Sequence, residues 1–165
     1  FSTDTSSGVI VGVDVSNHGS DAEEFLPMLN QLQARYDQTP AEGLVDGGFA
    51  TKETIDAAAK QGCVVYAPVK DEKKQQAAGK NPFEKKRGDT PTVTAWRERM
   101  GTAAAKLVYK LRAQTAEWVN AFARNRGFYT MPVRGLEKCR TIAVLYAVTH
   151  NLLQGAKLRA EADMS

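Results

Sequence analysis

Hydrophobic and polar positions alternate at the start of the chain, and this alternation predicts a β-hairpin. Residues 9–15 (VIVGVDV) carry valines at every second position with Asp14 on the opposite side, which is typical of a half-buried strand. The preceding segment, DTSSG at 4–8, supplies turn residues, and FST at 1–3 is expected to end an earlier strand. The chain should therefore open with a hairpin.

The pattern then changes to helix, strand, helix and strand. After a loop at 16–21, apolar residues at helical spacing predict a helix over 22–36. Residues 44–46 should form a short strand, 51–62 a helix, and the β-branched run 63–69 a buried strand. Two strands joined through a helix predict a parallel pair in an α/β layer.

Residues 70–91 interrupt this order with a polar segment. It holds seven Lys or Arg residues against four Asp or Glu residues, and almost nothing apolar. Two interpretations stay open for this basic insertion. It is either a solvated, partly disordered loop or a basic arm that contacts phosphates.

The C-terminal half is predicted to be helical, over residues 93–100, 103–126 and 136–158. A wheel at about 100° per residue places four large apolar residues of the second helix on one face. We expect that face to be buried, as core and not as a base-stacking platform: Leu107, Leu111, Trp118 and Phe122.

Length and composition bound the class of protein. With 165 residues, 42% hydrophobic and 25% charged, the chain has the size and composition of one globular domain. Cys63 and Cys139 lie far apart in apolar runs, so buried free thiols are the favoured interpretation over a disulfide. No apolar stretch of about 18 residues and no signal peptide is present, so we expect no membrane partner and a cytoplasmic protein.

Common catalytic motifs are missing. The sequence contains no GxxxxGK[ST], no GxSxG and no HExxH. His18 in a loop and His150 in an apolar helix are expected to be structural.

Asp46 follows a short apolar run and precedes two glycines, in LVDGGFAT at 44–51. An ordinary turn is one interpretation, because Asp-Gly is common turn chemistry. The other is a carboxylate held at the end of a rigid strand, where glycines let a large substrate approach.

Glu117 is the only acidic residue between 99 and 136, a stretch with seven basic residues. It shares a predicted helix face with Lys110 and Arg124, each seven residues away. An ordinary salt-bridging glutamate is one interpretation. The other is a metal-binding carboxylate on a surface that holds polyanions, with Asp46 as its partner from a separate element, as two-metal phosphoryl chemistry requires.

Both stretches resemble the insertion-sequence DDE transposases, bacterial enzymes with a ribonuclease-H-like catalytic domain. LVDGGFAT resembles the motif around their second aspartate. Tyr109, Arg112, Glu117 and Arg124 resemble their tyrosine, arginine, glutamate and lysine signature, with arginine at the last position. The flanking GVDVSNHGSDAEEFLPML, RNRGFYTMPVRG and THNLL fit as well, so the similarity covers nearly the whole of residues 1–165.

The resemblance implies an α/β fold, a ribonuclease-H-like mixed sheet with a helical C-terminal half. It implies DNA transposition by Mg²⁺- or Mn²⁺-dependent strand cleavage and strand transfer, with Asp46 and Glu117 as two of three carboxylates that hold two metal ions. Tyr109, Lys110, Arg112 and Arg124 would contact DNA, both transposon ends and target. A homo-oligomer is left open.

One departure from the family pattern concerns the first aspartate. In the family it lies on a strand before the opening hairpin, so that strand and residue are expected to be absent here. Asp4, the nearest acid, is expected to serve turn chemistry in place of metal binding. The resemblance therefore points to the C-terminal portion of a transposase catalytic domain, either an active fragment or a remnant that binds DNA or self-associates without catalysis.

Overall fold

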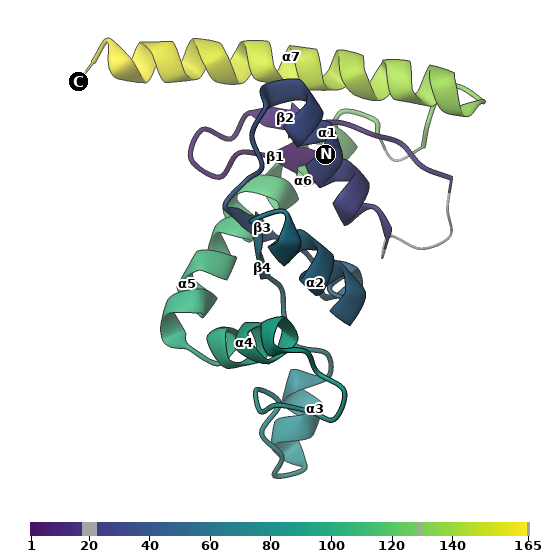
Figure 1. Cartoon of the computed structure of the whole chain (residues 1–165). Helices are drawn as coiled ribbons and strands as arrows, with labels where there is room; N and C mark the ends of the chain where they lie inside the picture. Colours follow the sequence, from purple (N-terminus) through teal and green to yellow (C-terminus); the bar gives the residue numbers. More distant parts are fainter. Residues whose placement is uncertain (18–22, 129, 165) are drawn as a thin grey trace. The chain divides into compact units, whose positions relative to one another are not determined.

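The chain folds as two compact units, shown together in Figure 1. In this computed structural model, residues 1–17, 23–128 and 130–164 are described. The terminal unit comprises residues 1–18 and 111–165, and the central unit comprises residues 19–110. The boundary between residues 110 and 111 falls inside a helix, α5 (Ala103–Arg112), so no linker composition marks it in the sequence.

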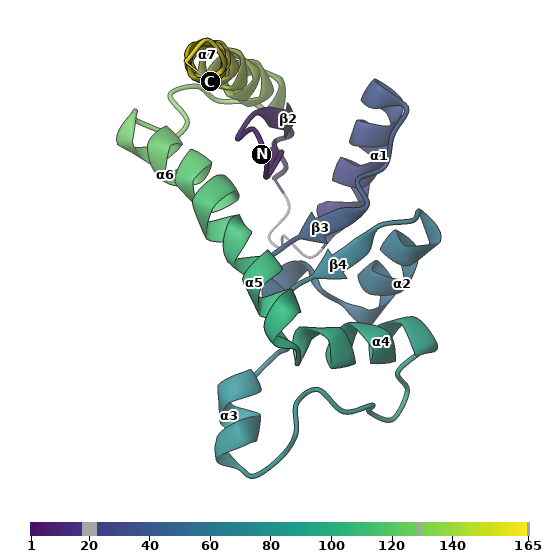
Figure 2. The same ribbon diagram turned by 90° about the vertical axis from the view of Figure 1, so that its left-hand side faces the viewer.

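The central unit is built on a parallel pair of short strands, β3 (Glu42–Leu44) and β4 (Val64–Tyr66), which confirms the predicted parallel pairing. The bounds differ, because β3 begins two residues before the predicted strand 44–46 and β4 is shorter than the predicted strand 63–69. Glu42 lies opposite Val64 and Leu44 opposite Tyr66. Figure 2 shows the pair side by side, with the following helices of the same unit close to it. The other elements of the unit are α1 (Phe25–Tyr36), the 3₁₀ turn η2 (Gly47–Phe49), α2 (Lys52–Lys60), α3 (Glu72–Ala77) and α4 (Pro91–Met100).

Local sequence signals set the ends of α2. The Thr51 hydroxyl accepts a hydrogen bond from the Thr54 amide at 3.1 Å, which satisfies one of the donors left open at a helix start. After the helix, Gly62 takes a φ of +82°, a backbone conformation that glycine adopts without steric cost. The predicted helix over 51–62 is confirmed within one residue at its start and two at its end.

The core of the central unit consists of large apolar side chains from three helices and β4. Phe25 and Leu29 of α1, Ile55 of α2, and Trp96 of α4 belong to it. Gly43 on β3 is packed so closely that a Cβ atom there would lie 2.6 Å from Cζ of Phe25, so only glycine fits without a shift of the ring. Val64 is the exception in the predicted buried strand, with an exposed side chain.

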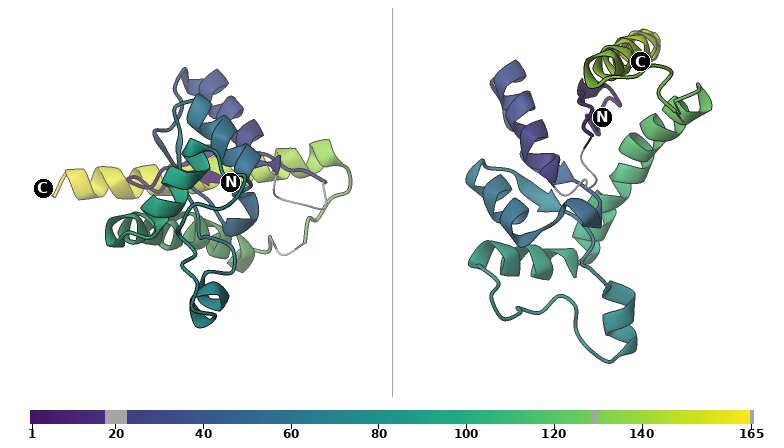
Figure 3. Two further views of the ribbon diagram at one scale, coloured as in Figure 1. Left: turned by 60° about the horizontal axis from the view of Figure 1, so that its bottom comes forward. Right: turned by 90° about the vertical axis from the view of Figure 1, so that its right-hand side faces the viewer.

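The basic insertion 70–91 is largely exposed, as expected of a solvated segment, but part of it forms a short helix. Residues Glu72–Ala77 form α3, and Pro82 is fully buried. Figure 3 shows α3 and the loop after it returning to α4 within the central unit. The loop is fixed by Asp89, whose side chain is 0% exposed.

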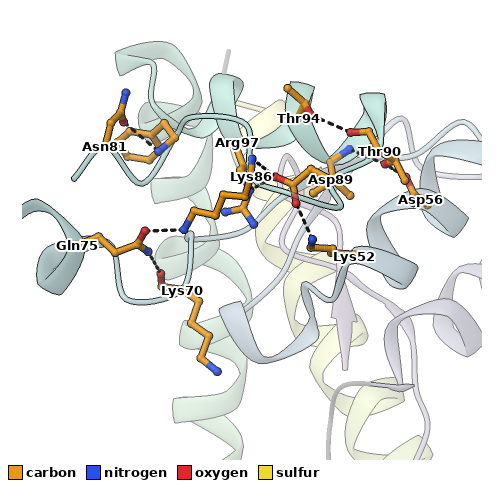
Figure 4. A network of polar contacts seen from close by, with 12 residues as sticks. Lys52, Asp56, Lys70, Gln75, Asn81, Lys86, Asp89, Thr90, Thr94 and Arg97 are labelled. Carbon is orange, nitrogen blue, oxygen red and sulfur yellow. Dashed lines mark hydrogen bonds and ion pairs between the residues drawn. The ribbon is translucent and has the colours of Figure 1, made fainter.

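Asp89 is the centre of a polar cluster that joins the insertion to two helices (Figure 4). Its carboxylate lies 2.8 Å from Nζ of Lys52 on α2 and accepts from Nε of Arg97 on α4 at 2.7 Å. It also accepts from the Lys86 amide at 2.8 Å. Burial alone would raise the pKa of Asp89, but these partners hold it well below the ordinary value.

The terminal unit begins with the predicted hairpin, strands β1 (Ser2–Thr3) and β2 (Ile10–Gly12), paired antiparallel. Its buried side is that of Ile10, and not the side of the valines that the alternation marks. Because both sides of β2 carry apolar residues, the two-residue period alone cannot choose between them. In the described residues the four strands form two separate two-stranded sheets.

The rest of the terminal unit is helical. The chain leaves α5 through a π-helical turn, η3 (Ala113–Glu117), and continues as α6 (Trp118–Asn125) and then α7 (Leu136–Ala162). Figure 1 shows α7 running along the hairpin. Ile10, Val119, Ala123, Tyr146 and Ala147 form the core between them.

Three polar side chains of α7 bind the backbone of the hairpin. Asn151 donates to the Ile10 carbonyl at 2.7 Å and accepts from the Ile10 amide at 2.8 Å. Gln154 donates to the Ser7 carbonyl at 2.7 Å, and Nε2 of His150 lies 2.9 Å from the Gly8 carbonyl. His150 is buried, which supports the structural role predicted for it; His18 lies outside the described residues.

Two further sequence predictions can be compared directly with the structure. Both cysteines are free, with Cys63 buried as expected but Cys139 only half-buried. Among the described residues, none of the helices has the length and apolar character needed to cross a lipid bilayer.

Candidate functional site

Asp46 is predicted as the last residue of a strand over 44–46, but it lies two residues after the end of β3 at Leu44. The Val45 amide still donates to the Tyr66 carbonyl at 3.0 Å, so the strand holds the residue before Asp46 in place. The Asp46 carboxylate is exposed and accepts from the Gly47 amide at 2.7 Å, which starts η2. A Cβ atom built on Gly48 would meet nothing within 4 Å. The structure thus combines a turn with open space beside a strand-end carboxylate.

Glu117 ends the π-helical turn η3 and has 56% of its side chain exposed. Nη1 of Arg112 donates to Oε1 of Glu117 at 2.6 Å. In an α-helix, residues five apart lie about 140° from one another around the axis, whereas a π turn brings them onto one side. The π turn is therefore what places Arg112 against the candidate metal ligand.

The other predicted DNA-contacting residues are divided between the two units. Tyr109 is partly buried against the core of the central unit, and Lys110 of the same unit is exposed. Arg124 is exposed in the terminal unit, where Nε donates to the Asn120 carbonyl at 3.4 Å. Of the six predicted site residues, the structure brings together Arg112 and Glu117, and it places Asp46 in the central unit and Glu117 in the terminal unit.

The buried stripe predicted for the long helix is wrong. Leu107, Leu111 and Trp118 are exposed, and Trp118 has 46% of its side chain accessible. The buried positions are Ala105, Thr115, Val119 and Ala123. A wheel with a constant angle fails across η3, so it no longer places Lys110 on the face of Glu117 and Arg124.

The exposed Trp118 and the half-buried Phe122 form an aromatic arrangement that the sequence interpretation assigned to the core. The rings of Trp118 and Phe122 stack with centroids 5.2 Å apart and planes 13° apart. The guanidinium carbon of Arg126 lies 3.9 Å from the Phe122 ring centroid. The spacing of four residues between Trp118, Phe122 and Arg126 is the feature of the sequence that could have predicted this arrangement.

Asp4 serves the hairpin turn. Its carboxylate accepts hydrogen bonds from the Ser6 hydroxyl at 2.6 Å and from the Ser7 amide at 2.8 Å. Burial would raise the pKa of Asp4, but the hydrogen bonds from Ser6 and Ser7 outweigh it and lower the pKa. These contacts match the turn chemistry expected of Asp4.

The donor atoms at the candidate site suit a hard divalent cation. Asp46 and Glu117 both offer carboxylate oxygens, the ligands that Mg²⁺ prefers. Within residues 1–17, 23–128 and 130–164, no three His, Cys, Asp or Glu side chains come together as a cation site. A metal bound by either carboxylate would take further ligands from other groups, such as water or phosphate oxygens.

Comparison with known proteins identifies the class. The family model described as "Transposase DDE domain" matches residues 2–152, so the chain belongs to this transposase family. This membership associates the chain with DNA transposition and recombination and with a DNA substrate, in a family that generally depends on a divalent metal. None of the curated proteins and none of the solved structures compared with the chain matches it.

Proposed function

We propose that the chain acts in metal-dependent cleavage and transfer of DNA strands, with Asp46 and Glu117 as two of the metal-binding carboxylates. The observation that carries this proposal is the family match over residues 2–152, which spans both residues. Their local settings support it, since Asp46 follows a strand beside the open position at Gly48, and Glu117 lies exposed on a helix. A ribonuclease-H-like arrangement of the complete domain belongs to the same proposal.

In the proposed reaction, the oxygen of water or of a DNA 3′-hydroxyl forms a bond to phosphorus. The bond from phosphorus to the opposite oxygen breaks in line, and that oxygen leaves with the other strand end. When bound, divalent ions favour ionisation of the attacking hydroxyl and stabilise charge on the leaving oxygen.

The proposed role of the other residues of the site is to bind and orient the DNA. Arg124 and Lys110, both exposed, are suited to charge-assisted contacts with backbone phosphates. Tyr109 would contribute a hydroxyl, from a ring anchored against the central core. Arg112 neutralises the Glu117 carboxylate through the 2.6 Å hydrogen bond when no other cation is present.

Titration with Mn²⁺ tests this proposal. We expect Asp46→Asn and Glu117→Gln each to weaken Mn²⁺ binding by about tenfold or more, because each removes a charged oxygen ligand. Isothermal titration calorimetry of the full chain, with and without a DNA strand to supply phosphate oxygens, gives the affinities. An unchanged Mn²⁺ affinity in both variants would overturn the metal site.

Arg112→Gln is the matched control, because it keeps the carboxylate and removes its partner. Arg112 and a metal ion compete for the same Glu117 oxygen, so this variant should bind Mn²⁺ more tightly than the natural chain. A weaker affinity would mean that Arg112 builds the site instead of competing for it.

A second candidate function is DNA binding without catalysis. The Arg112–Glu117 ion pair favours it, because a carboxylate that stays paired with arginine is a structural group and not a ligand. In that case DNA would bind with an affinity that both carboxylate variants leave intact, and no Mn²⁺ would bind in the micromolar to millimolar range.

A further inference from the structure

Trp118, Phe122 and Arg126 form a preassembled stack on the terminal unit. The two rings are nearly parallel, with centroids 5.2 Å apart, and Arg126 covers the Phe122 ring at 3.9 Å. Arginine over an aromatic face is a favourable cation–π arrangement. The order guanidinium, phenyl ring, indole ring therefore builds a flat, layered surface that ends at Trp118.

The ring of His150 packs against the side of this stack. Its ring meets Trp118 edge-on with centroids 5.7 Å apart and meets Phe122 at 6.4 Å. His150 is buried, and its Nε2 lies 2.9 Å from the Gly8 carbonyl oxygen, so the hairpin fixes the position of the His150 ring. Rings that are already fixed lose little conformational freedom when a ligand binds.

The indole of Trp118 remains accessible although it is large and apolar. It is 46% exposed, whereas the chain's other tryptophan, Trp96, is 4% exposed in the central core. Tryptophan is enriched at surfaces that contact partners, because it combines a large apolar ring with a polar N–H group. Trp118 also directly follows Glu117 in the sequence.

The surrounding charge identifies the chemistry of the partner. Glu117 is the only acid between residues 99 and 136. Arg124 on the same helix as Trp118, and Arg126 directly after that helix, are exposed. A ligand with flat apolar faces linked by negative groups matches both features. Aromatic side chains beside arginines are the usual means of holding unpaired bases of a single strand.

We infer that Trp118 is the stacking surface for an unpaired nucleobase of the DNA substrate, with Arg124 and Arg126 near its phosphates. The inference deepens the proposed function and rests on it for the identity of the ligand as DNA. It adds a site that binds unpaired bases without sequence preference, at the residue that follows Glu117. The stack requires no metal, which allows a separate test.

Binding of a fluorescently labelled single strand to the full chain, in the presence of EDTA, tests the inference. Two strands of equal length and charge are compared, one with normal bases and one with abasic residues at its central positions. Trp118→Leu should weaken binding of the normal strand by about 5- to 100-fold, the range for loss of one stacked base, and leave the abasic strand unaffected. Trp118→Phe should retain most of the affinity, because it keeps a ring.

Leu145→Ala is the matched control, since Leu145 is a large apolar residue that is 57% exposed in the same unit. It should leave both affinities unchanged. Tryptophan emission of the natural chain gives a readout that needs no variant. The normal strand should quench it and the abasic strand should not, because the buried Trp96 cannot contact a base.

Equal loss of affinity for the two strands in Trp118→Leu, or equal quenching by both, would overturn the inference. So would emission that changes with protein concentration alone, because that result assigns Trp118 to contacts between copies of the chain. Failure of the metal proposal is distinguishable, since it shows in Mn²⁺ titrations of the Asp46 and Glu117 variants and leaves the EDTA experiment unchanged.

Discussion

The two units of the molecule are stabilised by different means. The central unit buries large side chains such as Leu29, Val93 and Trp96. The buried side chain of Asp89 joins its basic insertion to α2 and α4. The terminal unit buries fewer large apolar side chains, chiefly Ile10, Val119 and Tyr146. It leaves large apolar residues of α7 exposed, among them Leu145 and Leu152. The first depends on apolar packing around one ionic cluster, and the second on a few polar contacts to the backbone.

This difference suggests where each unit is most sensitive. A packed core resists small changes but not the loss of a charge partner inside it. A unit held by side-chain amides on a hairpin is sensitive to those amides, while its exposed surface remains available for binding. The following changes test this contrast, beginning with the largest expected effect.

Asp89→Ala should destabilise the central unit by about 2–3 kcal/mol. The change leaves Arg97 without its partner at a buried position, while Lys52, which is 40% exposed, is partly screened by water. Urea unfolding followed by Trp96 emission in a Trp118→Phe background reports this unit alone. Glu72→Gln, which breaks the longer and more exposed contact with Lys106, should cost under about 0.5 kcal/mol. Equal effects of the two changes would remove the special role of Asp89.

Protonation of Asp89 at low pH should destabilise the central unit, as its substitution does. Lys52 and Arg97 lower its pKa in the folded state despite its burial, so the ionised carboxylate stabilises the fold above its ordinary pKa of 3.8. That contribution should decline as the pH falls below this value toward the folded pKa. In Asp89→Asn the corresponding part of the pH dependence should be missing. Parallel pH curves for both chains would contradict the assignment.

Asn151→Ala should destabilise the terminal unit by about 2 kcal/mol, because it removes two hydrogen bonds to Ile10 worth about 1 kcal/mol each. Amide hydrogen exchange of Ile10, measured by NMR, should accelerate accordingly. Asn151→Asp keeps the acceptor and loses the donor, so it should show an intermediate effect. Asn120→Ala on the exposed side of α6 serves as the control. Unaltered exchange at Ile10 would show that packing alone holds the hairpin.

Arg124→Gln should give the smallest effect, a change in salt dependence. If Arg124 contacts one phosphate, the slope of log affinity for duplex DNA against log salt should become shallower by about 1. Lys157→Gln, on the exposed end of α7, should leave the slope unchanged. A lower affinity with the natural slope would mean that Arg124 supports the fold and not DNA binding.

The elements defined by short-range signals could be predicted from the sequence. Turn residues and alternation predict the hairpin, and the capping threonine and the glycine at position 62 set the ends of α2. The strand–helix–strand order also predicts the parallel pair of β3 and β4. These features depend on neighbours within a few residues, so a single sequence contains them.

Features that depend on distant partners could not be predicted. The wheel weights Leu107 and Trp118 by hydrophobicity, but close contacts in this chain favour small residues such as Ala105 and Ala123. Thr115 can be buried because its hydroxyl donates to the Leu111 carbonyl at 2.9 Å. The composition of residues 70–91 did not reveal that Asp89 would be enclosed by Lys52 and Arg97.

The candidate site divides in the same way. Asp46 could be placed at the end of a strand from the apolar run before it, and Glu117 on a helix from its surroundings. The contact between Arg112 and Glu117 could not, because five residues is not a contact spacing in an α-helix and no residue type signals the π turn. Both carboxylates therefore remain predicted ligands.

The contact of Asn151 with both polar groups of Ile10 has a consequence for association between chains. A strand at the margin of a sheet displays unpaired amides and carbonyls that another chain could use as a template. On β2 the amide and carbonyl of Ile10 are already taken by a helix side chain, which imitates one residue of a neighbouring strand. An incoming strand would have to displace the Asn151 side chain before it could pair with Ile10. This side chain therefore protects the edge of β2 from pairing with another chain.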